Sequence, residues 1–70
     1  MSGPRLAPTI ALPTTPNVAT ADLVRAFGVT RQALWKWRRG HGFPLGEGGI
    51  SRTAPVAAWC AARGCAVRWV

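Results

Sequence analysis

The sequence predicts a single small domain that is mainly α-helical, with three short helices and a small β-hairpin. Apolar residues recur at helical spacing in three separate segments, and a glycine follows each segment. Residues 40–52 are different, because they hold five of the eight glycines together with Pro44. Seventy residues suffice for one domain. A chain of this length buries only about 60% of its unfolded surface, so its core must be small.

The two ends of the chain carry weaker signals than the middle. Residues 1–18 contain four prolines and little hydrophobic periodicity, which predicts a flexible N-terminal arm ahead of a domain over residues 19–64. The same prolines interrupt the apolar run that a signal peptide needs. The C-terminal tail, residues 65–70, alternates small, apolar and basic residues, and its pattern leaves open an edge strand or an oligomer contact.

The first helix is predicted over the run TADLVRAFG, with Thr20 as its N-cap. Asp22 follows in the first turn, where a negative charge suits the helix dipole. Leu23 and Phe27 lie one turn apart and share a face. Gly28 is expected to end the helix, since glycine accepts the left-handed conformation of a helix stop.

The second helix is predicted over residues 31–39, with Thr30 as its cap. Leu34 and Trp37 are three residues apart and are expected to face inward together. The outward positions are Arg31, Gln32, Trp35, Lys36 and Arg39. The role of Trp35 stays open, because an outward tryptophan suits a contact with a partner or support at the edge of the core.

Residues 42–51 are predicted to form the hairpin. Leu45 and Ile50 flank a glycine-rich turn, and such turns join the strands of short hairpins. The glycine content of residues 40–52 excludes a helix over that longer segment. Arg52 follows the return strand.

The third helix is predicted over the run TAPVAAWCAARG, with Thr53 or Ala54 as its cap. Pro55 falls in the first turn, where its missing N–H costs little. The apolar face consists of Val56, Trp59 and Cys60. Gly64 is expected to end this helix.

The charge of the chain points to a polyanionic partner. Nine Lys and Arg stand against two acids, for a net charge of +7, and eight of the nine cations are Arg. Arg makes bidentate contacts with phosphate and guanine better than Lys does. Nucleic acid and an anionic membrane surface both fit this charge, and so does simple solubility. A membrane role is the least favoured, because the second helix is short and no apolar run approaches the ~20 residues of a span.

Helix, glycine turn and helix form the pattern of a DNA-binding helix-turn-helix. In such a unit the second helix packs on the first and offers donors to the major groove from its N-terminal end. Arg31 and Gln32 hold that position, and their side chains suit guanine and adenine respectively. Phosphate contacts are expected from Lys36 and Arg39, with Arg38 and Arg52 in support.

The run ADLVRAFGVTRQALWKWRRGHGFP, the Gly-rich segment after it and the run TAPVAAWC resemble the MerR-type winged helix-turn-helix group. More narrowly, they are similar to its small phage and prophage members: excisionases, AlpA-like regulators and the DNA-binding domain of the lambda-like terminase small subunit. The matching positions are Gly28, Thr30, Trp37, Phe43-Pro44 and Trp59. The resemblance covers residues 18–63.

This resemblance implies a winged helix-turn-helix that binds specific double-stranded DNA in excision, transcription regulation or DNA packaging. The recognition helix would enter the major groove, and the wing, residues 42–51, would touch the adjacent minor groove or backbone. The wing tip carries Glu47 and no cation, so its phosphate contacts would come from backbone N–H groups, His41 and Arg52. The predicted DNA-binding residues are Thr30, Arg31, Gln32, Trp35, Lys36, Arg38, Arg39, His41 and Arg52.

A module of this size buries a modest interface, so a homo-oligomer or a cooperative array on DNA is expected. One alternative is a scaffold that binds a phage or host protein, with Trp35 and Trp69 as anchors. Another is a component of a DNA-packaging assembly, in which ring formation is the main task.

Metal, cofactor and catalytic roles have little support in the sequence. His41, Cys60 and Cys65 fall short of the four closely spaced ligands of a metal site, so no metal or cofactor is expected. One His, two acids and the absence of a Walker-type phosphate loop give no basis for an enzyme. Two cysteines are too few for a disulfide framework, which indicates the cytoplasm.

Overall fold

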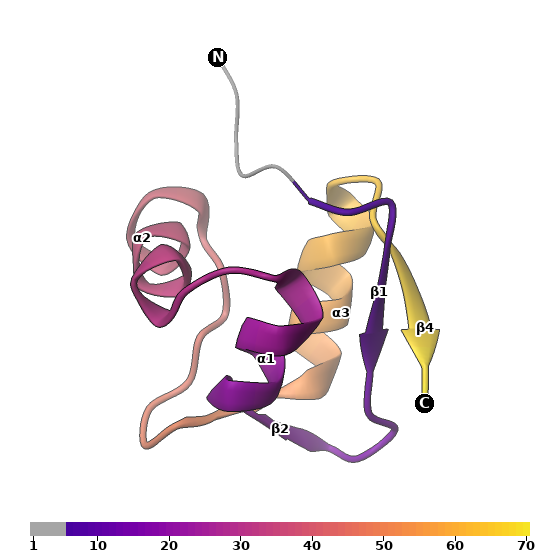
Figure 1. Ribbon diagram of the computed structural model, residues 1–70, viewed down its shortest axis with the longest axis horizontal. Coiled ribbons are helices and arrows are strands. Elements are labelled where there is room, and N and C mark those ends of the chain that lie inside the picture. Colours follow the sequence, from indigo (N-terminus) through magenta and orange to yellow (C-terminus); the bar gives the residue numbers. More distant parts are fainter. Residues whose placement is uncertain (1–5) are drawn as a thin grey trace.

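The computed structural model describes residues 6–70, and Figure 1 shows their arrangement. The elements along this part of the chain are β1 (Thr9–Leu12), β2 (Asn17–Ala19), α1 (Thr20–Phe27), α2 (Arg31–His41), β3 (Ile50–Arg52), α3 (Thr53–Ala62) and β4 (Ala66–Trp69). The three predicted helices are confirmed. The fold is nevertheless more mixed than the mainly α prediction, because two strand pairs stand in place of one hairpin.

β1 and β4 bring distant parts of the chain together as a parallel pair (Figure 1). Ile10 and Leu12 of β1 are buried in the core, and the residue between them is exposed. The prediction of a flexible arm over residues 1–18 is therefore wrong for this strand, and residues 1–5 lie outside the described part. The prolines around this segment hid the alternation of inward and outward residues that would have predicted a strand. Pro8 precedes β1, where it removes no ladder donor, and its carbonyl accepts from Ala66 N–H at 2.9 Å.

β4 settles one question that the tail sequence left open. Its residues pair with β1 in register, from Thr9 opposite Ala66 to Leu12 opposite Trp69. Residues 66–69 therefore form a strand of this domain, and Cys65, just before them, is buried.

β2 and β3 form an antiparallel pair with Val18 opposite Ser51. The hairpin predicted over residues 42–51 is therefore wrong, because it assigned the wrong partner strand to β3. β3 is the expected return strand, but it pairs with β2 and not with the segment around Leu45. Leu45 is instead buried in the core, and Gly46 N–H donates to Ser51 Oγ at 2.9 Å, so no ladder forms there. Because β2 pairs with β3, its residues also do not belong to a flexible arm.

The predicted glycine stops agree with the structure better than the predicted N-caps do. Gly28 ends α1 with φ 66°, and its N–H donates to Val24 O at 2.9 Å. Thr20 and Thr53 were both predicted as caps, but they are the first residues of α1 and α3, and both are buried. Each of these helices follows a strand without a linker, so the last strand residue takes the cap position instead.

α2 is longer than predicted. It continues past Arg39 through Gly40 to His41 and ends at Gly42, which has φ 67°. The expectation that residues 40–52 contain no helix is wrong for these two residues. A glycine lowers helix stability by about 1 kcal/mol, and packing of the last turn offsets such a cost.

The core has an aliphatic part and an aromatic part. The aliphatic part includes Ile10, Leu12, Val18, Leu23 and Val56, and Cys60 is buried in the same cluster. The aromatic part brings together Phe27, Trp37, Phe43 and Trp59. One ring of this part comes from each helix and one from the loop after α2, so the aromatic part joins α2 to the rest of the domain.

Candidate nucleic-acid interface

The start of α2 is fixed by a short turn and a side-chain cap. Gly28 and Val29 both donate backbone N–H groups to Val24 O, at 2.9 and 3.2 Å. Thr30 then accepts a hydrogen bond on Oγ1 from Ala33 N at 3.1 Å, as predicted for an N-cap. A cap of this kind satisfies one of the free donors of the first turn. The backbone is therefore fixed just where the predicted base-reading residues begin.

α2 separates buried from exposed side chains by face, as its sequence predicts. Leu34 and Trp37 are buried. The exposed side chains are Arg31, Gln32, Trp35, Lys36, Arg38 and Arg39. Four of these six are cations, and the helix contains no acid. The structure thus brings most of the predicted DNA-binding residues onto one exposed surface, which we call the α2 face.

Aromatic contacts hold the inner side of α2. Trp37 stacks on Trp59 of α3, with ring centroids 5.6 Å apart and an interplanar angle of 22°. Its ring also meets Phe27 of α1 edge-on at 5.5 Å and Phe43 at 5.8 Å. Pairs of this kind contribute ~0.5–1.5 kcal/mol each beyond the area they bury. Trp37 is therefore the main anchor of the helix.

The last carbonyl of α2 is tied to α3. His41 O accepts from Trp59 Nε1 at 2.9 Å and from Arg63 Nη2 at 2.8 Å. The Arg63 guanidinium also lies 4.1 Å from the centre of the Trp59 ring. These donors satisfy a carbonyl that the end of a helix would otherwise leave free. No sequence period pointed to Arg63, because its contact depends on the packing of two helices.

His41 does not belong to the α2 face. It lies one turn after Trp37, on the inner side of the helix, and is half-buried. Arg52 is also placed elsewhere, since it pairs with Asn17 in the β2–β3 ladder and lines a cavity beside α3. The structure therefore does not bring these two predicted contacts together with the others.

Trp35 lies on the α2 face with 49% of its surface exposed. The Arg38 guanidinium lies 5.2 Å from the centre of its ring, which is within range of a cation–π contact. Trp35 and Arg31 border a groove of about 310 Å3, and residues 45–49 form its other wall. The groove was not predicted, because it depends on how the loop folds back.

The loop that forms this wall is held close to the domain. A Cβ on Gly46 would collide with the backbone carbonyl of Ile50, so only glycine fits there. Gly49 O accepts from Thr20 N at 2.8 Å, which ties the loop to α1. Glu47 lines the groove and places one negative charge beside the cationic helix.

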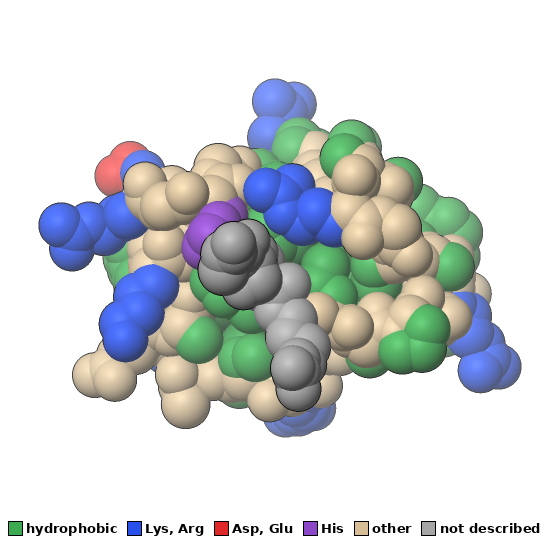
Figure 2. Space-filling model, turned by 90° about the horizontal axis from the view of Figure 1, so that it is seen from above, with side chains coloured by type: hydrophobic (Ala, Val, Ile, Leu, Met, Phe, Trp, Pro, Cys, Tyr) green, Lys and Arg blue, Asp and Glu red, His purple; other side chains and the backbone are tan. Residues whose placement is uncertain are grey.

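Positive charge is not confined to the α2 face. Figure 2 shows Lys and Arg side chains projecting from several sides of the molecule. Exposed cations outside α2 include Arg25, Arg63 and Arg68. α2 is distinguished by its density of positive charge, because it carries four cations within residues 31–39.

The two cysteines are part of the core. Burial, and next the nearby Cys65 thiol, raise the pKa of Cys60 to about 12. At neutral pH the Cys60 thiol is therefore protonated and a poor nucleophile or metal ligand. Across residues 6–70, no group of three or more His, Cys, Asp or Glu side chains lies close enough to hold a metal ion. The helices of this same region all lack the length and apolar character that crossing a membrane requires.

Comparison with known proteins gave no match among protein families, curated proteins or solved structures. The ground for a functional proposal is therefore the geometry of α2 and its surroundings.

Proposed function

We propose that this chain is a small sequence-specific protein that binds double-stranded DNA through the α2 face. The supporting observation is the division of α2 into two sides. Leu34 and Trp37 anchor one side, and four cations with Gln32 occupy the other. A recognition helix needs such a packed inner side and free hydrogen-bond donors on its outer side.

Each part of the α2 face has a proposed role. Arg31 and Gln32 stand in the first turn, directly after the Thr30 cap, and read base edges in the major groove. Lys36, Arg38 and Arg39 follow along the helix and bind phosphates. These phosphate contacts fix the register of the helix but carry no sequence information.

We assign the loop after α2 the role of a wing, which makes the unit a winged helix-turn-helix. The loop lies across the groove from Arg31 and Trp35. DNA bound to the α2 face would therefore pass beside it. Glu47 disfavours a phosphate at its tip, so contact would come from the backbone N–H groups of the glycines. Arg52 and His41 lie off the α2 face and act only as supporting contacts.

The biological setting follows from the resemblance to small phage and prophage regulators. On that basis we propose a cytoplasmic protein that serves excision, transcription regulation or DNA packaging. A module of this size needs a second copy or an array for useful specificity. Val70 is 67% exposed and follows β4, so this end of the chain offers a contact between copies. The mass of the protein–DNA complex measured by light scattering tests this.

The experiment is a titration into a labelled duplex of random sequence at two salt concentrations. The logarithm of the affinity falls by about 0.9 per contacted phosphate for each decade of salt. Four cations on the α2 face predict a slope of about −3 to −4, which is roughly a hundredfold loss for a fourfold rise in salt. Absence of binding at low salt would refute the proposal.

A second candidate is a protein-binding module with Trp35 as its anchor. The half-exposed ring favours it, because exposed tryptophans concentrate at interfaces. Binding through an apolar anchor depends little on salt. A Trp35→Ala variant that keeps normal DNA affinity, together with a salt-insensitive protein partner that it loses, would favour this candidate.

A further inference from the structure

The groove between α2 and the loop after it carries opposite charges on its two walls. Arg31 lies on the α2 wall, and Glu47 lies on the loop wall. Within the described residues no salt bridge joins these two side chains, so the guanidinium and the carboxylate both stay available to a ligand. The groove therefore offers hydrogen-bond donors from one wall and acceptors from the other.

An aromatic surface lies beside these charges. Trp35 lines the same groove, and 49% of its surface is exposed. The Arg38 guanidinium lies over its ring, 5.2 Å from the ring centre, and this contact restrains the indole. Nucleic-acid bases stack on exposed rings of this kind with little preference for sequence. The ring therefore suits a base but does not by itself select one.

The loop wall leaves room for a flat ring. A Cβ on Gly48 or Gly49 would meet no other atom within 4 Å, so the groove is open beside both glycines. The buried side chain of Leu45 adds an apolar patch to the lining. The volume of about 310 Å3 is at the lower end of the range for small-molecule sites. It therefore suits a single heterocyclic base.

The two charges distinguish guanine from the other bases. A carboxylate only accepts hydrogen bonds, and a guanidinium only donates them. Guanine has two adjacent donors, N1–H and the N2 amine, on its Watson–Crick edge, and two acceptors, O6 and N7, on its Hoogsteen edge. Adenine has one donor and one acceptor on each of these edges, and neither cytosine nor thymine has two adjacent ring-edge donors. Guanine therefore matches a groove with a carboxylate on one wall and a guanidinium on the other.

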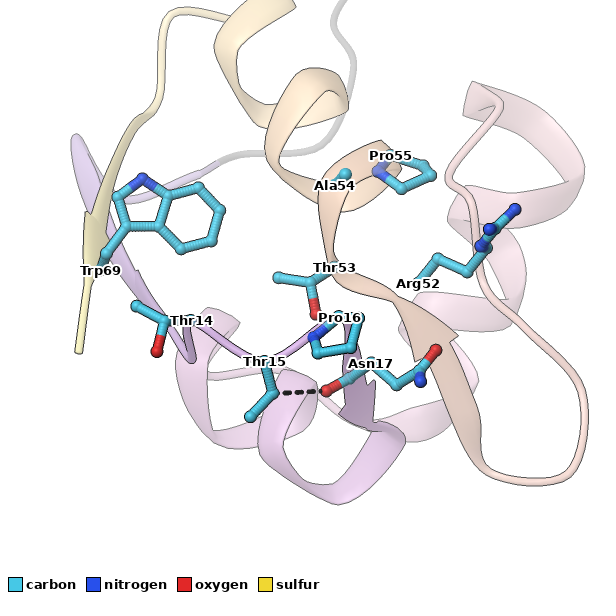
Figure 3. A pocket seen from close by; sticks show the side chains of 9 residues that line it. All are labelled: Thr14, Thr15, Pro16, Asn17, Arg52, Thr53, Ala54, Pro55 and Trp69. Carbon is cyan, nitrogen blue, oxygen red and sulfur yellow. Dashed lines mark hydrogen bonds between the residues drawn. The ribbon is translucent and has the colours of Figure 1, made fainter.

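A larger cavity elsewhere in the domain lacks this arrangement. It has a volume of about 560 Å3 and lies between the first turn of α3, the turn before β2 and Trp69 (Figure 3). Arg52 is its charged lining residue, and no acid is among the described residues that line it. Trp69 is 50% exposed, much like Trp35, but it has no carboxylate in its cavity. It is therefore a matched control for Trp35.

We propose that the groove beside α2 binds an unpaired guanine base. Trp35 stacks on the base, Glu47 accepts from its Watson–Crick edge and Arg31 donates to its Hoogsteen edge. The inference goes beyond the proposed binding of double-stranded DNA, because in a duplex the Watson–Crick edge of guanine is paired with cytosine. It also gives Glu47 a role, which a phosphate contact at the tip of the loop does not.

The test is a titration of the full chain into labelled single strands at low salt, followed by fluorescence anisotropy. The strands are thymine pentamers with guanine, adenine, hypoxanthine or 7-deazaguanine at the centre. Hypoxanthine lacks the N2 amine of guanine, and 7-deazaguanine lacks its N7 acceptor. The guanine strand is expected to bind about tenfold more tightly than the adenine strand and at least about threefold more tightly than either analogue. Equal affinity for the guanine and adenine strands overturns the proposal.

Competition by mononucleotides distinguishes two sources of the base. Deoxyguanosine monophosphate that competes as well as the guanine strand identifies a free nucleotide as the ligand, and much weaker competition identifies a base within a strand. In both cases deoxyadenosine monophosphate is expected to compete at least about fivefold more weakly, and equal competition by the two overturns the proposal. Binding of a random duplex is measured in parallel. Loss of duplex binding alone refutes the proposed function, whereas loss of the guanine preference alone refutes this inference.

Substitution of the two acids separates a contact with the base from a change of charge. Glu47→Gln is expected to bind the guanine and hypoxanthine strands within about twofold of each other, because the acceptor for the N2 amine is gone. Asp22→Asn makes the same change of charge outside the groove and is expected to keep the guanine preference. A preference that survives Glu47→Gln, or that both variants lose equally, overturns the proposal.

Substitution of the two exposed tryptophans tests stacking. Trp35→Ala is expected to weaken binding of all four strands about fivefold or more, because stacking is shared by every base. Trp69→Ala is expected to change these affinities less than about twofold. Circular dichroism of both variants checks that the helices are intact. Equal effects of the two substitutions would place the bound base outside this groove and overturn the proposal.

Discussion

The two ends of the domain differ in how their surfaces relate to the core. At one end, α2 buries Leu34 and Trp37 and leaves its cations exposed. At the other end, β1 supplies core residues itself, and α3 and Trp69 enclose a largely uncharged cavity. Figure 1 shows α1 and α3 between these two ends. Because the outer side chains of α2 contribute little to the packing of the core, they are free to serve binding.

The largest expected effect is that of Trp37→Ala on the anchored side of α2. It removes a ring that contacts three other aromatic residues, and such changes cost about 3–5 kcal/mol. This is a large part of the total stability of a small domain. Urea unfolding followed by circular dichroism measures it. Trp35→Ala is the control on the outer side and is expected to cost less than about 1 kcal/mol. Equal losses in the two variants would mean that the inner side of α2 does not anchor the helix more than its outer side does.

The next effect concerns the opposite end. Leu12 of β1 is fully buried, so Leu12→Ala is expected to cost about 2–5 kcal/mol in the same unfolding measurement. Ala11→Ser, at the exposed neighbouring position, is expected to change stability by less than about 0.5 kcal/mol. If Leu12→Ala is as stable as the parent, β1 is not part of the core.

The difference between the two ends also explains what the sequence could predict. α1, its glycine stop and the Thr30 cap depend on neighbouring residues, and local patterns predict them well. β1 and β4 are far apart in the chain, so nothing near Ile10 indicates that Val67 lies opposite it. The same limit applies to β3, whose partner is β2 and not the loop beside it.

The same distinction between local and long-range contacts applies to the candidate site. The α2 face was predictable because one helix carries it, and helical period separates its sides. His41 and Arg52 were grouped with that face by sequence proximity, but the packing of α3 and the β2–β3 ladder place them elsewhere. The cavity beside Thr53 and Trp69 was not predictable, because it joins segments from three parts of the chain.

A smaller effect concerns pH and the buried Cys60 thiol. Burial raises the pKa of Cys60 from 9.0 to about 12 in the folded protein. Above pH 9 the unfolded chain loses this proton and the folded chain keeps it, so stability is full below pH 9 and falls as pH rises toward 12. A loss of about 1 kcal/mol is expected between pH 8 and pH 10. Unfolding of Cys60→Ala at both pH values is the control, and an unchanged pH dependence in that variant would contradict this account.

A further effect on stability of similar size is expected from Thr30→Ala. It removes the side-chain acceptor for Ala33 N and is expected to cost about 1 kcal/mol, measured by thermal unfolding. Thr30→Ser keeps the hydroxyl and is expected to restore most of the loss. A serine variant no more stable than the alanine variant would show that the cap does not fix the start of α2.

DNA binding by the α2 face is tested by the same substitution at the two ends of the domain. Arg39→Gln on the α2 face and Arg68→Gln on β4 each remove one positive charge from an exposed position. Affinity for duplex DNA is measured for both variants and the parent over a range of salt. Arg39→Gln is expected to weaken binding about tenfold and to lower the salt slope by about one, whereas Arg68→Gln is expected to change affinity less than about twofold. Equal losses in the two variants would mean that DNA responds to total charge, and α2 would then not be its binding surface.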